Sequence, residues 1–439
     1  MKPTIVALLA AFMLTVCGAL AQSTPRSTLE CLSEAPYPCI APAQVGLDAE
    51  VLRAFTDDLL EWVEGGQLAG AELLVIKDRQ IAWHAAVGWS DRERGRPLER
   101  NSIYRIRSMT KPFVGAAILM LAEDGRLDLD DRVAEYLPSF DNERSGAITI
   151  RQLLAHGTGF EQTDFPPTYW AQPNLREAVK LVGETGPPNP PGERYRYSDH
   201  NSATLGAIVA ELTGAPVEES IRTRILEPLG LSDTHMHFAP DYAWAARMNS
   251  TYRLRGNRLV RYWDNSQPQQ TPWFRASGGI YTTVFDYARW LELWMDEGTL
   301  AGVRILSPET VGEALRPGYT EGYGLHWELY RGSPAGAKLP AFGHGGSDGT
   351  IAIAYPYADA MILFFTQSRG ARGPWQDAMQ RLPSLVGMEG AVRYPEPRTS
   401  GRNSTSYHAS PWQELTVASQ LRLSRWTVNR SIGMNEGIY

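Results

Sequence analysis

A serine and a lysine stand three positions apart, just before an apolar run, where they could form a catalytic pair. Ser108 and Lys111 precede Phe113–Leu121, which is apolar nearly all round and therefore predicts a buried helix. Residues i and i+3 share a helix face, so both side chains would point into the same space. Burial and the positive helix end favour a neutral lysine amine, and such a base activates a serine hydroxyl. The spacing predicts nucleophilic catalysis, although a helix cap with a solvated lysine has the same pattern.

A second candidate is Tyr197, which stands with Asp199 just before a helical pattern at 201–212. A tyrosine close to a lysine ammonium can have a lowered pKa and can shuttle a proton. The alternative is a half-buried structural tyrosine. We predict that Tyr197 shares proton transfer with Lys111.

The third candidate is the segment Gly-His-Gly-Gly-Ser at 343–347, ahead of an apolar run at 350–354 that predicts a strand. Glycines let a substrate approach the backbone closely, and exposed N–H groups there could form half of an oxyanion hole. A plain turn is the alternative for this segment.

Two rival sites can be weighed against these candidates. Gly345-Gly346-Ser347-Asp348-Gly349 matches the nucleophile elbow, which needs a preceding strand, a following helix, and then an acid and a histidine. A strand pattern follows here instead, and the only later histidine is His408. No carboxylate completes a recognised zinc spacing around the pair His235 and His237. We therefore predict no elbow, no metal and no cofactor.

The three candidates together resemble a known family. Ser108-x-x-Lys111, Tyr197-x-Asp199 and His344-Gly345-Gly346 follow the order and approximate spacing of motifs in the penicillin-recognising serine hydrolases. The branch with class C β-lactamases, DD-peptidases, D-aminopeptidases and related esterases looks closest. Other segments are also similar to that family, namely 153–159, 229–234 and 276–280, and the resemblance covers roughly residues 45–385.

The resemblance implies a fold and a reaction. The fold is of the α/β (α+β) type, with an antiparallel sheet flanked by helices, built from both ends of the domain, and a mostly helical insert at about 108–270. In the implied reaction Ser108 attacks a carbonyl, Lys111 and Tyr197 handle the proton, and water releases the acyl group. The N–H groups of Ser108 and Ser347 would hold the oxyanion. The implied substrate-binding residues are Asp199, His344, Gly345 and Gly346.

Two positions depart from the β-lactamase pattern. Asp199 replaces the usual Asn, and His344 replaces the Lys of β-lactamases. A histidine is mostly neutral at pH ~7.5, and an ionised Asp199 would repel an anionic substrate while favouring protonated Lys111. We therefore expect esterase or D-amino-acid peptidase activity rather than β-lactam hydrolysis. The alternative is a non-catalytic binding protein for cell-wall peptides, which would not need Ser108, Lys111 and Tyr197 together.

The amino terminus predicts export. Met1-Lys2, an apolar run at 5–16 and Ala19-Leu20-Ala21 are typical of a signal peptide at 1–21, which implies a periplasmic or secreted protein without a membrane span in the mature chain. Lipidation of Cys17 is disfavoured because Val16 is large. Cys31 and Cys39 could pair within a leader at 22–44.

The chain as a whole has ordinary globular composition. The full chain has 439 residues, of which 43% are hydrophobic, and a net charge of −7 without a basic block, so nucleic acid is not an expected partner. A small ester, amide or short peptide is the expected substrate. We predict a hydrolase domain at 45–388 and a tail of uncertain structure at 389–439.

Hydrophobic periodicity gives the outline of the domain. It predicts helices at about 48–64, 113–121, 174–183, 202–213, 285–297 and 374–382. It predicts strands at 71–76, 80–87, 279–283, 323–330, 350–354 and 361–366. Short adjacent strands without intervening helices favour antiparallel pairing.

Overall fold

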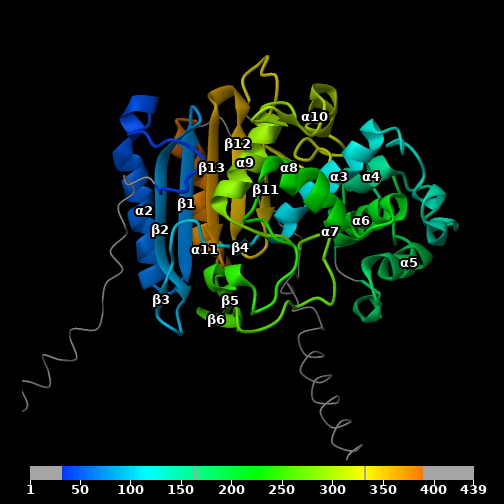
Figure 1. Cartoon of the computed structure of the whole chain (residues 1–439), viewed down its shortest axis with the longest axis horizontal. Coiled ribbons are helices and arrows are strands. Elements are labelled where there is room, and N and C mark those ends of the chain that lie inside the picture. Colours follow the sequence, from blue (N-terminus) through cyan, green and yellow to red (C-terminus); the bar gives the residue numbers. More distant parts are fainter. Residues whose placement is uncertain (1–31, 163–164, 167, 331–332, 389–439) are drawn as a thin grey trace, which may run out of the picture. The chain divides into compact units, whose positions relative to one another are not determined.

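An antiparallel sheet runs through the described residues, and strands from both ends of the chain build it. Its order is β10-β11-β12-β13-β1-β2-β3, so β1 (Gly70–Lys77) lies between β2 (Gln80–Asp91) and β13 (Ala360–Thr366). Figure 1 shows the blue β1 and β2 beside the orange β13. The remaining strands of this sheet are β3 (Arg96–Pro97), β10 (Glu328–Tyr330), β11 (Ala341–Gly346) and β12 (Thr350–Tyr355). The predicted sheet built from both ends is confirmed.

The computed structural model describes residues 32–162, 165–166, 168–330 and 333–388. The predicted signal peptide, Cys17, Cys31 and the tail at 389–439 lie outside the described residues. Cys39 is disulfide-bonded, and its pairing with Cys31 stays a prediction. Within the described part of the chain, no helix combines the length and the apolar character needed to cross a bilayer.

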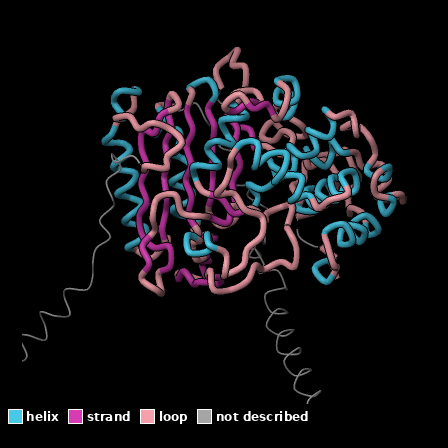
Figure 2. Tube along the Cα trace, in the orientation of Figure 1, coloured by secondary structure: helices cyan, strands magenta, loops and turns pink. Residues whose placement is uncertain are grey.

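Helices cover the sheet and form the insert, which Figure 2 shows as a region of cyan coils to one side of the magenta strands. The described α-helices are α2 (Ala49–Glu64), α3 (Lys111–Glu123), α4 (Ile150–Leu154), α5 (Leu175–Thr185), α6 (Asp199–Thr213), α7 (Val217–Ile221), α8 (Glu227–Leu229), α9 (Val284–Met295), α10 (Pro308–Ala314) and α11 (Arg372–Arg381). All six predicted helices are therefore present, with ends shifted by a few residues.

Both faces of the sheet are buried, which explains why its strands have continuous apolar sequences. In β1, Leu73 and Val75 belong to the core cluster that contains the apolar face of α2. The alternate residues Leu74 and Ile76 belong to the other core cluster, together with Trp290 of α9. The sheet thus lies between α2 and α11 on one face and α9 on the other.

The site lies where the insert meets the sheet. A short 3₁₀ helix, η2 (Arg107–Thr110), leads into α3, which is buried from Lys111 to Leu121, as its sequence predicts. The helix α6 packs against α3, and η2 lies beside β11. Ser198 caps α6 by accepting a hydrogen bond from the N–H of His200. These contacts bring segments from three distant parts of the sequence together.

Some strands differ from the predictions. The glycine-rich segment at 343–347, for which a plain turn was the alternative, lies largely in the strand β11, which was not among the predicted strands. The predicted strand at 323–330 is a strand only in β10. The insert predicted as mostly helical up to 270 ends in a hairpin, β5 (Thr251–Arg255) and β6 (Arg258–Trp263), paired with β14 (Ser368–Arg369). The turn of this hairpin uses Gly256 with a φ of 59°, where glycine has no steric penalty. The smaller pairs are β4 (Tyr104–Arg105) with β7 (Tyr281–Thr282), and β8 (Thr299–Leu300) with β9 (Val303–Arg304).

The close approach of β12 to β11 predicts a stability difference between two glycine substitutions. A Cβ at Gly343 would lie 2.1 Å from the carbonyl oxygen of Ala352, whereas a Cβ at Gly312 in α10 would meet nothing within 4 Å. We expect Gly343→Ala to lower the free energy of unfolding by about 1–3 kcal/mol. Gly312→Ala should raise it by up to about 1 kcal/mol because alanine favours a helix. Urea denaturation measures both, and equal effects would contradict this account of β11.

Candidate active site

The side chains of Ser108 and Lys111 meet at the junction of η2 and α3. The Nζ atom of Lys111 lies 3.3 Å from Oγ of Ser108 and has no exposed surface, while Ser108 is half-buried. The same Nζ donates to Oδ1 of Asp199 at 2.7 Å and to the carbonyl oxygen of Ser277 at 3.0 Å. Burial lowers the pKa of Lys111, although the charge of Asp199 opposes this effect. The predicted pair is therefore in contact.

Tyr197 completes this group from the segment that leads into α6. The Nζ atom of Lys111 lies 4.7 Å from the centroid of its ring, and its hydroxyl is hydrogen-bonded to Ser108. The prediction of a lowered tyrosine pKa is wrong. Burial raises the pKa of Tyr197 well above its usual value, and the charge of Asp199 raises it further. Tyr197 therefore stays a protonated phenol, and Lys111 is the better base of the two.

Asp199 forms the first turn of α6 and accepts hydrogen bonds from two cations. Its Oδ1 faces Lys111, and its Oδ2 accepts from the guanidinium of Arg275. Burial raises the pKa of Asp199, but Lys111 and Arg275 together outweigh burial and hold this pKa well below its ordinary value. Asp199 is thus an ionised carboxylate whose charge Arg275 compensates, with Lys111 adding to this only when its amine is protonated. The expected repulsion of anionic substrates by Asp199 is therefore much reduced.

Histidine 344 lies on β11, and its side chain is 1% exposed. Its Nδ1 lies 2.8 Å from the carbonyl oxygen of Gly345, and its Nε2 lies 3.2 Å from the hydroxyl of Tyr323. These contacts fit a neutral ring with the proton on Nδ1. Burial lowers the pKa of His344, which agrees with the expectation of a neutral side chain at this position.

Sequence reasoning gave no role to an aromatic cluster behind Tyr197. The ring of His156 lies 4.5 Å from that of Tyr197 and 5.0 Å from that of Tyr323. Its Nδ1 lies 2.7 Å from Nδ2 of Asn201, while its Nε2 has no hydrogen-bond partner among the described residues. Burial lowers the pKa of His156 well below its usual value. The signal for this residue was its place in the segment 153–159, which carries part of the family resemblance.

The end of β11 packs directly on the chain before Ser108. A Cβ at Gly346 would lie 2.3 Å from the carbonyl oxygen of Ile106, so only glycine fits there. Gly345 is half-exposed and Ser347 is exposed in the following turn. The predicted glycines therefore allow a close approach between β11 and η2, which carries Ser108.

An ion pair joins the neighbours of the two predicted oxyanion donors. Arg107 precedes Ser108, Asp348 follows Ser347, and Nε of Arg107 donates to Oδ2 of Asp348. The hydroxyl of Tyr262 on β6 donates to Oδ1 of Asp348 at 2.9 Å and accepts from Arg107 at 3.1 Å. The side chain of Asp348 is fully buried. This pair ties η2 to the turn after β11.

The structure also bears on the two rival sites. The strand β12 pairs with β11 directly after the 347–349 turn, so the helix that a nucleophile elbow requires is replaced by a strand. The ring of His235 stacks on Trp244 with centroids 4.0 Å apart, and His237 faces Glu218 at 3.5 Å. His235 therefore packs against Trp244, whereas His237 contacts Glu218, and the two histidines have different partners.

The sequence and fold place the chain in a family. A family model described as Beta-lactamase matches residues 50–382, so the protein belongs to the Beta-lactamase family, whose members are generally serine hydrolases. The resemblance to penicillin-recognising serine hydrolases is confirmed. An uncharacterised protein of Mycobacterium tuberculosis is 30% identical over 365 residues, covering 70% of this chain and 88% of that protein.

Solved structures share the fold. A penicillin-binding protein homologue from Pyrococcus abyssi has a TM-score of 0.63 at 24% identity, over 78% of this chain and 79% of its own. EstCE1, a hydrolase with promiscuous acyltransferase activity, has a TM-score of 0.63 at 18% identity, over 77% and 98%. A D-stereospecific amidohydrolase from Streptomyces has a TM-score of 0.58 at 22% identity, over 74% and 97%.

The buried ion pair predicts a pH-dependent loss of stability on substitution of Asp348. Burial raises the pKa of Asp348, but Arg107 and neighbouring arginines outweigh burial and lower it to about 2. Asp348→Asn leaves Arg107 without its carboxylate, so we expect it to cost about 3–5 kcal/mol at pH 7. The pKa of this carboxyl is about 3.9 in the unfolded chain and lower in the folded protein. The ionised carboxylate therefore contributes its full stability above pH ~4, and this contribution is lost as the pH falls toward 2. The difference between wild type and variant should therefore shrink over the acidic range.

The control for this prediction is Glu135→Gln, which removes the exposed pair with Arg132. It should cost less than about 1 kcal/mol at any pH. Urea denaturation at pH 7 and pH 3 compares the variants with wild type. A loss for Asp348→Asn as small as the control's would show that the ion pair does not tie η2 to β11.

Proposed function

We propose that this protein is a serine hydrolase that cleaves ester or amide bonds of small substrates through an acyl-enzyme on Ser108. The observation that carries the proposal is the buried Lys111 amine, 3.3 Å from the Ser108 hydroxyl. Tyr197 lies against both groups, which supports a shared path for the proton. Membership of a family of serine hydrolases supports the same reaction class.

In the proposed first half-reaction, neutral Lys111 takes the proton of Ser108 as Oγ forms a bond to the substrate carbonyl carbon. The carbonyl oxygen becomes an oxyanion, held by the N–H groups of Ser108 and Ser347, and each such donor contributes about 10²–10³ in kcat. The bond to the leaving group then breaks, and the leaving group takes the proton back through Lys111 or Tyr197. In the second half-reaction Lys111 takes a proton from water as the water oxygen bonds to the ester carbon. The bond between that carbon and Oγ then breaks, and Oγ of Ser108 takes the proton from Lys111. Side chains and water suffice for these steps, so we propose no metal or cofactor.

The substrate preference follows from the charges around the site. His344 is neutral, so β11 lacks the fixed positive charge that β-lactamases place beside the substrate carboxylate. We therefore propose that esters or D-amino-acid peptides are preferred over β-lactams, with Asp199, His344, Gly345 and Gly346 contacting the substrate. The esterase-like and D-amidohydrolase structures with the same fold are consistent with this preference. The sequence at 1–21 supports a periplasmic or secreted location.

The proposal predicts a covalent adduct at one position. A fluorophosphonate should add its phosphonyl group to the peptide that contains Ser108, and Ser108→Ala should lose both this adduct and the hydrolysis of short-chain p-nitrophenyl esters. Ser347→Ala is the matched control, because its predicted role uses only the backbone N–H, and it should keep the adduct. Intact-mass spectrometry and peptide mapping measure the result. A protein that binds cell-wall peptides without catalysis would show neither adduct nor turnover, and an adduct on Ser347 would overturn the assignment.

The contact between Asp199 and Lys111 predicts a shift in the pH profile. Burial lowers the pKa of Lys111 and the charge of Asp199 raises it, so Asp199→Asn should lower it further. Because the neutral amine is the base, the rising limb of kcat/KM for a neutral ester should move to lower pH in Asp199→Asn. Tyr197→Phe is the comparison, since it should lower kcat by about 10²–10⁴ without this shift. A limb that stays in place would argue against Lys111 as the base.

A further inference from the structure

His156 follows α4 in a backbone conformation that is unusual for a residue with a side chain. Its φ is 55°, in the left-handed region. The N–H of His156 donates to the carbonyl oxygen of Leu153. The N–H of Gly157 donates to that of Gln152, so the helix ends in a Schellman motif. Glycine is usual at the left-handed position of this motif because a Cβ there costs about 1–2 kcal/mol, so the histidine needs contacts that offset this cost.

The ring of His156 accepts hydrogen bonds through one nitrogen. The main-chain N–H of Ser198 donates to Nδ1 at 3.3 Å, and Nδ2 of Asn201 donates to the same atom at 2.7 Å. A main-chain N–H can only donate, so Nδ1 carries no proton and the ring is neutral. The proton must then lie on Nε2, which is buried without a hydrogen-bond partner among the described residues.

A further hydrogen bond orients Asn201. The hydroxyl of Thr158 donates to Oδ1 of Asn201 at 2.7 Å, so the amide presents its NH₂ group to His156. The side chains of all three residues are fully buried. Asn201 belongs to the first turn of α6, so His156 and Thr158 join the loop after α4 to the start of α6.

His156 holds the chain on both sides of Tyr197. The carbonyl oxygen of His156 accepts from the N–H of Arg196 at 2.7 Å, and its Nδ1 accepts from the N–H of Ser198. The ring centroids of His156 and Tyr197 lie 4.5 Å apart. The backbone is therefore fixed one residue before and one residue after Tyr197, and the histidine ring packs against the phenol ring.

These contacts exclude His156 as a base in the reaction. The lone pair of Nδ1 is used by Ser198 and Asn201, and Nε2 already carries a proton. Taking up a second proton would place an N–H opposite the N–H of Ser198 and break that contact. Any effect of His156 on turnover must therefore pass through the residues that it holds.

We propose that His156 is a positioning residue, which fixes the phenol of Tyr197 against Ser108 and Lys111 by accepting hydrogen bonds on both sides of Tyr197. The inference rests on the serine hydrolase reaction proposed above. A displacement of ~1 Å at a reacting group can cost about 10² in rate, so a contact behind Tyr197 affects turnover without touching the substrate.

The first test measures the tautomer of His156 and needs no turnover. The protein is labelled with nitrogen-15 in its histidine rings, and the nitrogen shifts distinguish a protonated from an unprotonated ring nitrogen. The signals of His156 are those lost in His156→Asn. We expect the proton on Nε2. A proton on Nδ1 would overturn the inference, because Nδ1 could not then accept from Ser198.

The second test compares three substitutions of His156. His156→Phe keeps a ring but removes the acceptor, and His156→Gly removes the acceptor while relieving the backbone strain. His156→Asn keeps an acceptor bonded to Cγ, and asparagine tolerates the left-handed region. With p-nitrophenyl butyrate, the Phe and Gly variants should lose about 10² in kcat with little change in KM, whereas the Asn variant should keep most of its activity.

The Gly and Asn variants separate the acceptor from the strain. A Gly variant as active as the Asn variant would show that the backbone conformation decides the rate, and would overturn the inference. The Gly variant also carries the test if the Phe variant does not fold, which circular dichroism checks.

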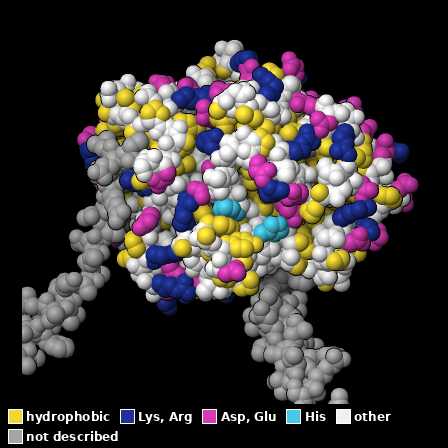
Figure 3. Space-filling view, in the orientation of Figure 1, with side chains coloured by type: hydrophobic (Ala, Val, Ile, Leu, Met, Phe, Trp, Pro, Cys, Tyr) yellow, Lys and Arg dark blue, Asp and Glu magenta, His cyan; other side chains and the backbone are white. Residues whose placement is uncertain are grey.

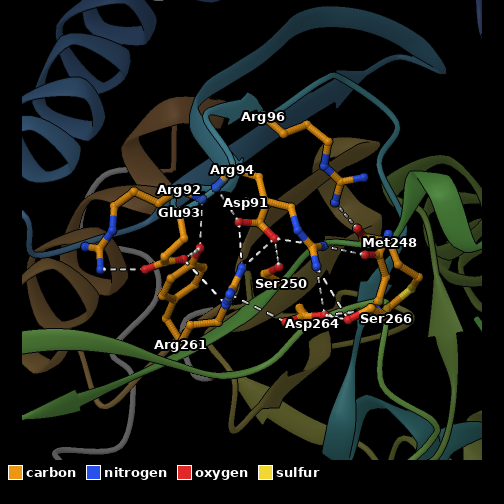
Figure 4. A network of polar contacts seen from close by, with 12 residues as sticks. Asp91, Arg92, Glu93, Arg94, Arg96, Met248, Ser250, Arg261, Asp264 and Ser266 are labelled. Carbon is orange, nitrogen blue, oxygen red and sulfur yellow. Dashed lines mark hydrogen bonds and ion pairs between the residues drawn. The ribbon is translucent and has the colours of Figure 1, made fainter.

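The control is the loss of a buried hydrogen bond elsewhere. Figure 4 shows Ser250 beside Asp91 in a network with Arg94 and Arg261, which joins β2 to the hairpin of β5 and β6. The hydroxyl of Ser250 donates to Oδ2 of Asp91 at 2.8 Å, and both residues are buried. Ser250→Ala should leave kcat unchanged. A loss equal to that of His156→Gly would show a general effect of buried hydrogen bonds and would overturn the specific role of His156.

The third test asks whether His156 acts through Tyr197. In Tyr197→Phe, which lacks the phenol hydroxyl, adding His156→Gly should lower kcat little further, because residues that act as a unit are not additive. The same loss with and without this hydroxyl would show a merely structural role and would overturn the inference.

The outcomes separate this inference from the proposed function. If the wild type hydrolyses the ester and forms the adduct on Ser108 but the two losses multiply, the hydrolase stands and the positioning role is wrong. If the wild type shows neither turnover nor adduct, the proposed function fails and the positioning role is overturned with it. The nitrogen shifts still decide in that case whether Ser198 is bound to His156.

Discussion

The buried amine of Lys111 is the group on which the arrangement of the site depends. Its Nζ contacts Ser108 on η2, Asp199 on α6 and the carbonyl of Ser277 in the segment before β7. An unsatisfied amine in the interior is costly, so these three segments must converge on the start of α3 for the fold to be stable. The same contacts place a base beside the nucleophile. Stability and the geometry of the site therefore have one cause.

Two buried carboxylates organise the charges on either side of Ser108. Asp199 is bound by Lys111 and Arg275, and Asp348 by Arg107, with Arg369 at 3.7 Å. Each carboxylate thus neutralises its surroundings and also joins segments that are far apart in the sequence. On the surface, by contrast, acidic and basic side chains are interspersed, as Figure 3 shows for one face. The opposite charges around Ser108 are therefore paired in the interior, through Asp199 and Asp348.

Local patterns predicted the parts of the structure that local physics decides. The apolar run at 113–121 is a buried helix. Alternate residues of the apolar strand β1 pack into two different core clusters, as expected for a sheet covered on both faces. The strand β11 was missed because its glycines have low strand propensity, and the reason for them, the carbonyl of Ala352 near Gly343, lies on another strand. The pKa of Tyr197 was expected to be lowered by a lysine, but it is raised, because the sequence does not show that the tyrosine is buried. Arg275 and Asp348 were given no role because their partners are distant in sequence.

The backbone of Arg107 gives a last argument about the nucleophile. Its φ is 51°, in the left-handed region where a side chain costs energy and glycine does not. Such a residue costs of order 1–3 kcal/mol and persists only when its surroundings hold it there. Here the ion pair with buried Asp348 and the hydrogen bond to Tyr262 supply that support. The contacts of the Arg107 side chain thus offset the strain of the Arg107 backbone. The turn that presents Ser108 is therefore fixed by the interactions of Arg107, not by those of Ser108.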